Sequence, residues 1–305
     1  MPSPTADIRT DRPLSVHPRD RMIWQPDMFL AGLAPGQSGA DNGYGIGDCL
    51  LIDAQRGIYA VADASDRCPQ ASRALLEHFH AALPRGGGPP SPREMDAAVA
   101  AAFADQAYTA RSTFCCVALR SEKGRSVARI TSGGDSFAAV ISTTDARVVH
   151  QSASDMTFAG RSKNVPTGRD VVLDDAHWCI LLATDGWHDL SPPAATDVDT
   201  IVRLAAAVFT GRAPRLKRIL GGDDLAFIIV SPGATPLPPD ATPAVIMGGT
   251  SAAETAAARR RRSHFPASPG WLPPQAWPDC LKDLDAAGIR VLSPGAITTA
   301  MENLA

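Results

Sequence analysis

The sequence predicts an α+β domain, and two kinds of pattern lead to this class. Short apolar runs end at Asp/Gly turns, as strands do; they cover residues 49–52, 58–62, 177–184 and 225–230. Longer segments carry apolar residues at fourfold spacing, as one face of a helix does; they begin near residues 70 and 92. Strands joined by tight turns, with helices between them in the chain, are typical of a mixed α+β protein.

The first strand pair is predicted as a hairpin. Residues 53–57 separate its two apolar runs, and Gly57 closes the turn. If Ala54 faces Gly57, the numbers of every opposed pair add up to 111, so Asp48 faces Asp63. Opposed antiparallel residues have Cα atoms roughly 4.5–5.5 Å apart. Two carboxylates that close repel each other, and a cation or a shared proton would relieve the repulsion.

A second pair of aspartates repeats this arrangement. Asp185 follows the strand at 177–184, whereas Asp223 precedes the strand at 225–230. If these strands are antiparallel, the end of one and the start of the other lie on the same side of the sheet. A single Asp at a strand end is often a turn residue that bonds its own backbone. Four aspartates at strand ends instead favour a metal site.

The middle of the chain is predicted to hold further strands. Residues 126–131 and 137–142 flank a tight Gly-rich turn that carries Asp135, where glycine permits positive φ. A strand at 147–151 then leads into a long surface loop that reaches Gly168.

Three helices are expected. The first covers 70–80, ends near Pro84, and places Ala71, Leu75, Phe79 and Leu83 on its buried stripe, with His78 and His80 towards solvent. The second begins with Ser91 as cap and Pro92 at the first position, and runs towards Tyr108. The third covers 198–209.

Composition predicts one domain with two appended ends. A flexible segment is expected at 1–25, the folded domain at 26–232, and a Pro/Ala-rich linker and tail at 233–305. The tail carries four consecutive arginines, which either contact an acidic partner or form a solvated helix end: Arg259, Arg260, Arg261 and Arg262.

Several classes of protein are disfavoured. The net charge of −3 argues against nucleic acid as a partner, because binding to phosphate backbones is driven by Lys and Arg. No apolar run approaches the roughly 20 residues of a membrane helix, and the N-terminus lacks a signal-peptide core. A cytoplasmic location is therefore expected. Four cysteines lie in predicted strands as small apolar residues, whereas Cys68 is expected to be exposed.

Four sequence blocks, taken in order, resemble those of the metal-dependent protein phosphatases of type 2C, the PPM-type serine/threonine phosphatases. The blocks are residues 60–63 for V-A-D-G, 133–136 for V-G-D-S, 183–186 for S-D-G and 223–226 for D-N-x-T. Ser112 and Thr113 are similar to the small step that opens the family's central strand. The resemblance covers about residues 28–230.

The resemblance implies a four-layer α-β-β-α sandwich, in which two antiparallel sheets pack face to face with helices outside. It also implies two Mn²⁺ or Mg²⁺ ions at one end, with a weak third. The implied direct ligands are Asp63, Asp185, Asp223 and the carbonyl of Ala64. Asp135 would bind the third ion, and Asp48 would lie next to the ligands without binding an ion itself. Such hard oxygen ligands suit Mg²⁺ and Mn²⁺.

The implied activity is the hydrolysis of phosphoserine and phosphothreonine in a phosphorylated protein, within cell signalling. Two adjacent ions can activate a water that attacks phosphorus, so no nucleophilic side chain is needed. Asp63, Asp185 and Asp223 would act in catalysis through that water.

The chain departs from the family pattern where substrate is handled. Gly47 replaces a Glu, Gly43 lies near the position of a phosphate-gripping Arg, Phe137 replaces a common Arg, and residues 64–69 replace a Gly-Gly-His step. Arg67 is the candidate replacement for binding phosphate. His188 is expected as a turn or outer-shell residue. The departures leave two alternatives, a catalytically impaired pseudophosphatase acting as a regulatory binding module and a phosphatase of a small phosphorylated molecule.

Overall fold

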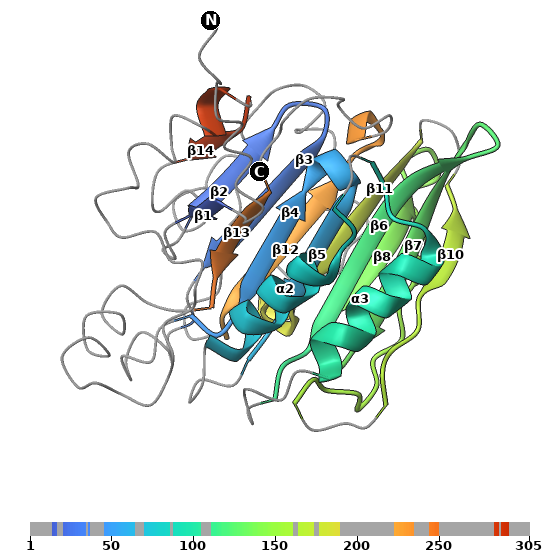
Figure 1. The fold of residues 1–305 in the computed structure, drawn as a ribbon. Coiled ribbons are helices and arrows are strands. Elements are labelled where there is room, and N and C mark those ends of the chain that lie inside the picture. Colours follow the sequence, from blue (N-terminus) through green and yellow to red (C-terminus); the bar gives the residue numbers. More distant parts are fainter. Residues whose placement is uncertain are drawn as a thin grey trace, which may run out of the picture.

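Two seven-stranded sheets face each other in the computed structural model (Figure 1). The structure describes residues 14–16, 21–34, 36, 46–64, 70–85, 88–104, 111–160, 164–173, 177–189, 223–234, 244–249, 284–286 and 288–292. Within these ranges, no helix is long and apolar enough to cross a membrane.

The first sheet has the order β1 (Leu14–Val16), β13 (Val245–Gly248), β4 (Cys49–Asp53), β5 (Ile58–Ala62), β6 (Phe114–Glu122), β7 (Arg125–Gly133) and β10 (Arg169–Val172). The second has the order β14 (Arg290–Leu292), β2 (Arg21–Gln25), β3 (Phe29–Ala34), β12 (Leu225–Val230), β11 (Trp178–Ala183), β8 (Phe137–Ser142) and β9 (Arg147–Gln151). Neighbouring strands are antiparallel, except that β1 and β13 are parallel.

The core lies between the sheets, and a second apolar layer lies under the helices. Alternate residues of β4 and β5 divide between them, because side chains of a strand point to opposite faces. Leu50 and Val61 join Ile180 of the other sheet in the core, whereas Leu51 and Ala60 face the helices. Burial of both faces explains why these strands are continuously apolar in sequence.

Helices α2 (Gln70–Ala82) and α3 (Pro92–Ala104) cover the outer face of the first sheet (Figure 1). The predicted start of α3 is confirmed by a capping box, in which the Glu94 N–H donates to Ser91 Oγ and the Ser91 N–H donates to Glu94 Oε2. Phe79 and Phe103 both contact Phe114 edge-on, with ring centroids 5.2 and 5.8 Å apart. The third predicted helix lies outside the described residues.

The predicted sandwich of two facing sheets with helices outside is confirmed, whereas its predicted limits are wrong. The N-terminal segment supplies β1 and β2, and the C-terminal tail supplies β13 and β14. Both ends of the chain therefore extend the sheets, and residues 26 and 232 do not bound them. Helix α2 helps to hold β13 in the first sheet, because the fully buried Arg73 donates to the carbonyl of Gly248 on β13.

His80 is also placed differently from the prediction. The prediction that it faces solvent is wrong, because it is 6% exposed and its Nε2 lies 3.1 Å from Oδ2 of Asp53. The hairpin end that carries Asp53 packs under α2 and supplies this partner.

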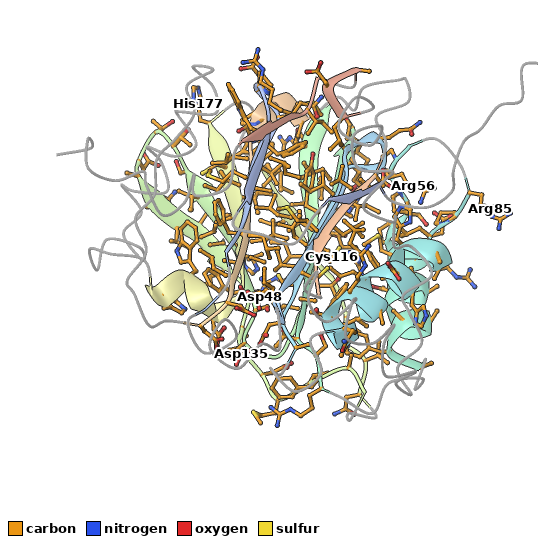
Figure 2. The ribbon with its side chains drawn as sticks, turned by 90° about the vertical axis from the view of Figure 1, so that its left-hand side faces the viewer. Asp48, Arg56, Arg85, Cys116, Asp135 and His177 are labelled. Carbon is orange, nitrogen blue, oxygen red and sulfur yellow. The ribbon has the colours of Figure 1, made fainter. Side chains whose placement is uncertain are left out.

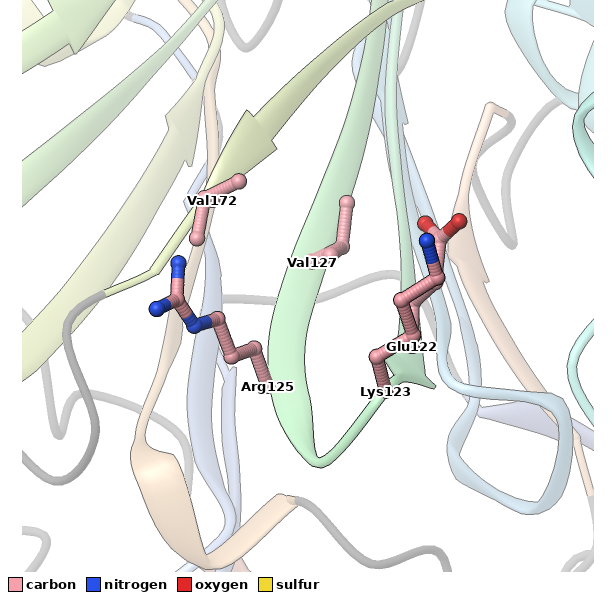
Figure 3. Close-up of a pocket in the computed structure, with 5 residues that line it drawn as sticks. All are labelled: Glu122, Lys123, Arg125, Val127 and Val172. Atoms are coloured by element: carbon pink, nitrogen blue, oxygen red, sulfur yellow. The ribbon is translucent and has the colours of Figure 1, made fainter.

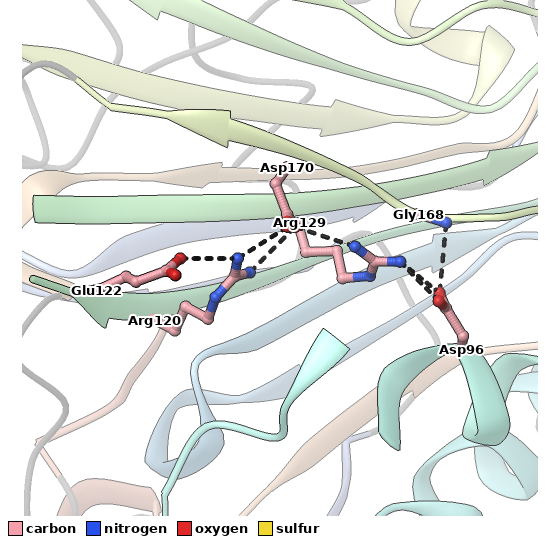
Figure 4. Close-up of polar contacts among 6 residues, drawn as sticks. All are labelled: Asp96, Arg120, Glu122, Arg129, Gly168 and Asp170. Carbon is pink, nitrogen blue, oxygen red and sulfur yellow. Dashed lines mark hydrogen bonds and ion pairs between the residues drawn. The ribbon is translucent and has the colours of Figure 1, made fainter. Parts of the chain in front are cut away.

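A buried arginine joins three elements on the helix-covered face of the first sheet (Figure 4). Arg129 of β7 contacts Asp96 of α3 at 2.7 Å and Asp170 of β10 at 3.1 Å. Asp170 also pairs with Arg120 at 2.9 Å, and the Gly168 N–H donates to Asp96. This Arg129 cluster fixes edge strand β10 against α3.

Candidate carboxylate site

The hairpin has the predicted register. Cys49 pairs with Ala62, and beyond them the Ala64 N–H donates to the carbonyl of Gly47. Asp48 and Asp63 lie between these pairs, so they face each other as predicted. Their carboxyl groups are hydrogen-bonded to each other. The expected close contact of the two carboxyls is thus confirmed.

The second pair of aspartates lies at one end of the second sheet. Ala183 pairs with Phe227 in the antiparallel pair β11–β12, so Asp185 at the end of β11 lies beside the residues that open β12. Asp185 is half-buried and Asp223 is exposed, whereas Asp224 is buried. The prediction that strand ends bring Asp185 and Asp223 to the same side is confirmed.

The two pairs meet across the sandwich. Thr184 of the second sheet donates a hydrogen bond of 2.5 Å to Oδ2 of Asp48 in the first. The turn that carries Asp135 crosses from β7 to β8, and therefore from one sheet to the other. Figure 2 shows Asp48 and Asp135 at the same end of the molecule. The sheets thus bring aspartates from five strand ends to one place.

Electrostatics show how strongly these groups interact. Burial, followed by the charges of Asp185, Asp223 and Asp135, raises the pKa of Asp63 to about 7. Burial and the charges of Asp63 and Asp224 raise the pKa of Asp48 well above its ordinary value. Burial is the larger cause of both raised pKa values, and the neighbouring carboxylates add to it.

Backbone contacts hold the end of β5 in place. The Asp63 N–H donates to Oγ1 of Thr113, while the Asp63 carbonyl accepts from the Thr113 N–H and from Oγ of Ser112. Thr113 Oγ1 is also hydrogen-bonded to Oγ of Ser136, beside Asp135. These bonds use the backbone of Asp63 and leave its carboxylate directed at the other acids.

Two of the aspartates, Asp224 and Asp48, stabilise the surrounding structure by hydrogen bonds and are not among the predicted direct ligands. Asp224 accepts hydrogen bonds from the N–H groups of Gly36 and Gly47, one with each carboxylate oxygen. Asp48 accepts from Thr184 and is hydrogen-bonded to Asp63. Sequence reasoning missed Asp224 and Thr184, although the doublet at 223–224 and the hydroxyl before Asp185 were available as signals.

The donor set fits a hard divalent cation by its chemistry. Its members are carboxylates, which Mg²⁺ and Mn²⁺ prefer, and they are partly buried and mutually repelling. As the side chains lie, no three Asp, Glu, His or Cys groups in the described ranges form a ready metal-binding group. The assignment of Asp63, Asp185, Asp223, Asp135 and the Ala64 carbonyl as ligands therefore stays a prediction.

Comparison with known proteins gives a likeness in structure but not in sequence. No model of a protein family matches the chain, and no curated protein matches it. The solved structures with a similar fold include bacterial serine/threonine phosphatases. The catalytic domain of the serine/threonine phosphatase PstP, solved with two manganese ions, is 16% identical, with a TM-score of 0.46 over 69% of this chain and 98% of that one.

Two further structures show the same degree of likeness. The PPM phosphatase MsPP from Mycobacterium smegmatis, in complex with cacodylate, is 17% identical, with a TM-score of 0.42 over 68% of this chain and 99% of that one. Stp1 from Staphylococcus aureus is 14% identical, with a TM-score of 0.44 over 67% and 94%. At these values the functional interpretation depends on the residues of this chain.

Gly47, which replaces the Glu of the PPM pattern, is required by the backbone here. A Cβ at this position would lie 2.3 Å from the carbonyl oxygen of Ala64 and 3.5 Å from Oδ2 of Asp224. The Gly47 carbonyl also accepts from Oγ of Ser72 on α2. The absence of a carboxylate side chain at position 47 therefore reflects the close packing of the Gly47 and Ala64 backbones. The Gly47 N–H donates to the carboxylate of Asp224.

The other departures lie partly outside the described residues. The Phe137 ring stacks on His188, with centroids 5.5 Å apart and planes 17° apart, and His188 is exposed. This agrees with the expected turn position of His188. Arg67, the candidate phosphate-binding residue, lies outside the described residues, as do Gly43 and Cys68.

One hollow among the described residues lies away from the carboxylates. It has a volume of about 390 Å³ and is lined by Glu122, Lys123, Arg125, Val127 and Val172 (Figure 3). These residues surround the β6–β7 hairpin tip, whereas Thr113 and Asp135 flank the opposite ends of the same strands. The hollow is therefore separate from the carboxylate site.

Proposed function

We propose that the protein is a metal-dependent phosphomonoesterase that removes phosphate from phosphoserine or phosphothreonine in proteins. The observation that carries this proposal is the meeting of Asp48, Asp63, Asp185 and Asp223 at one end of the sandwich, where burial, together with the charges of Asp185 and Asp223, raises the pKa of Asp63 to about 7. Clustered buried carboxylates are costly unless a cation or proton neutralises them. Perturbed pKa values of this kind mark functional sites.

Two Mn²⁺ or Mg²⁺ ions are the proposed cofactors, and Asp135 would serve a weaker third. Asp63, Asp185, Asp223 and the Ala64 carbonyl would hold them. When bound, such ions supply positive charge to the phosphoryl oxygens and make water a strong nucleophile at neutral pH. This chemistry needs no nucleophilic side chain.

The residues around the ligands have supporting roles. Asp48 holds the Asp63 carboxylate through their shared hydrogen bond, and Thr184 holds Asp48. Thr113 fixes the Asp63 backbone, and Asp224 fixes Gly47 next to Asp48. These contacts keep the carboxylates in place before cations arrive, which is the preorganisation that catalysis by fixed charges requires.

The exposed members of the cluster support a large substrate. Asp135 and Asp223 are exposed, so the site opens to solvent on one side. A phosphorylated side chain on a protein surface can approach from that side. We accordingly propose a phosphorylated protein as the partner and signalling in the cytoplasm as the setting.

A regulatory binding module is the second candidate. Two observations favour it: the Ala64 carbonyl excludes a carboxylate from position 47, and the described side chains form no ready metal-binding group. In this reading the fold and its surface are retained for binding a partner without turnover.

Turnover separates the two candidates. We would measure hydrolysis of para-nitrophenyl phosphate and of a phosphothreonine peptide across a Mn²⁺ titration. Asp185→Asn removes a proposed ligand, and Asp145→Asn, at an exposed turn, is the matched control. Metal-dependent turnover that Asp185→Asn abolishes and Asp145→Asn retains is expected. Absence of turnover at saturating Mn²⁺ in folded protein would instead favour the binding module.

A further inference from the structure

Arg111 is an exposed cation beside the carboxylate site. It precedes Ser112, whose backbone pairs with Ala64 on one side and with Ala159 on the other. Its guanidinium carbon lies 4.1 Å from the centre of the Phe158 ring, which is a cation–π contact. The side chain is therefore held over a ring and not left to move freely in solvent.

The Phe158 ring connects Arg111 to the turn that carries Asp135. A Cβ placed on Gly134 would lie 3.1 Å from Cε1 of Phe158 and 2.8 Å from Cγ2 of Thr113. The ring thus packs directly on Gly134, next to Asp135. One phenyl ring separates the guanidinium from a proposed metal-binding turn.

The segment that carries Phe158 is fixed to the same turn by hydrogen bonds. The Asp155 N–H donates to the carbonyl of Gly134, and Asp155 Oδ1 accepts from the N–H groups of Gly134 and Thr157. The Ala159 N–H donates to the carbonyl of Ser112. Phe158 and Arg111 therefore have a defined position relative to the carboxylates.

Met156 adds exposed apolar surface to this side of the site. It is 78% exposed and directly follows Asp155, which is hydrogen-bonded to Gly134 of the turn. We call Arg111, Met156 and Phe158 the Arg111 rim. The rim combines a fixed cation with an apolar side chain, whereas the adjoining cluster is acidic. A ligand that covers both the rim and the acidic cluster needs two anionic groups. A doubly charged phosphoryl group would bind cations held by the aspartates, and a second anionic group would bind Arg111.

We propose that the Arg111 rim binds an acidic side chain adjacent to the phosphorylated residue, so that the preferred substrate is a phosphoprotein segment with acidic flanks. This inference rests on the proposed function and names its substrate class. Arg111 is a specificity-determining residue in this account. The stacked guanidinium keeps its edge N–H groups available, and a carboxylate can accept two of them.

The test compares two phosphothreonine peptides. The Glu peptide has Glu on both sides of the phosphothreonine, and the Gln peptide has Gln at the same positions. Para-nitrophenyl phosphate serves as a substrate without flanks. The variant is Arg111→Gln, and Arg125→Gln, an exposed arginine at the far hairpin tip, is the matched control. Arg111→Lys keeps the charge, and thermal unfolding of each variant checks its fold.

Arg111→Gln is expected to raise KM for the Glu peptide by about threefold or more, as expected for loss of an exposed ion pair. KM for the Gln peptide and for para-nitrophenyl phosphate should stay unchanged, and Arg125→Gln should alter none of the three. Added salt should reduce the preference of the wild-type protein for the Glu peptide. An equal change for all three substrates, or none for the Glu peptide, would overturn the proposal.

A measurement of peptide binding tests the Arg111 rim independently of catalysis. Fluorescence anisotropy of the labelled peptides, with Mn²⁺ present, should show weaker binding of the Glu peptide alone in Arg111→Gln. If para-nitrophenyl phosphate is not hydrolysed by the wild type, the proposed enzymatic function fails, and anisotropy still decides on the rim. Equal binding of both peptides by wild type and variant would contradict the rim proposal.

Discussion

Thr184 donates a 2.5 Å hydrogen bond to Asp48 and thereby joins the end of β11 in one sheet to the start of β4 in the other. The same hydroxyl accepts from the Ala226 N–H on β12. One buried side chain thus sets the position of both pairs of aspartates. The site depends on how the two sheets are aligned as well as on each hairpin.

Replacement of Thr184 by Val is expected to destabilise the protein by about 1–3 kcal/mol, because it leaves buried polar groups of Asp48 and Ala226 without this partner. Urea unfolding measures the loss. Thr184→Ser keeps the hydroxyl and should retain most of the stability. If Thr184→Val is as stable as the wild type, the bond does not hold the sheets in register.

The stability of the metal-free protein is expected to fall as pH rises from about 4 to about 7. The pKa of Asp63 is raised to about 7 in the folded state, against an ordinary value of 3.8. Between these values the folded protein binds more protons than the unfolded chain, so each rise in pH favours unfolding. Urea unfolding in EDTA at several pH values measures the slope.

Asp48→Asn is the control for this pH dependence. The variant removes a carboxyl whose own pKa is raised in the folded state, so the slope should be smaller than in the wild type. Mn²⁺ added at pH 8 should restore stability to the wild type, because a ligand of the folded state stabilises it. A flat wild-type profile would show that the carboxylates do not interact as described.

Gly47→Glu, which would restore the PPM pattern, is expected to lower both stability and turnover. Its Cβ would lie 2.3 Å from the Ala64 carbonyl, so two backbones must separate next to Asp63. Gly124→Ala provides a reference, since that position has positive φ and open space and should cost about 1 kcal/mol. Thermal unfolding compares the two. Higher turnover in Gly47→Glu would mean that the backbones can separate.

Arg129→Met is expected to cost about 1–3 kcal/mol and to leave metal-dependent turnover unchanged. Arg129 is 9% exposed at its side chain and contacts both Asp96 and Asp170, which lose their buried partner. Arg129→Lys should recover part of the loss. A change in turnover at constant stability would show that β10 and α3 act on the site.

Local patterns predicted the parts of the site that depend on a single turn. The facing of Asp48 and Asp63 follows from a five-residue connection and the twofold period of strands, and the structure has that register. The start of α3 was likewise predictable, since Ser91 and Glu94 form a local capping box.

Contacts between distant segments were not predictable in this way. The tail has a Pro-rich composition, yet β13 pairs with β4 because Arg73 and the outer edge of β4 offer it partners. His80 is buried because Asp53, far from it in sequence, lies beneath it. Asp224 gains its role from Gly36 and Gly47, and no local pattern indicates such partners.

The most direct test of the central claim is a crystal structure with Mn²⁺ and its anomalous scattering. We predict two strong anomalous peaks among Asp63, Asp185 and Asp223. We also predict that the hydrogen bond between the Asp63 and Asp48 carboxyl groups is absent in that structure. A structure at saturating Mn²⁺ without anomalous density at these carboxylates would contradict the account, and would show that protons alone neutralise the cluster.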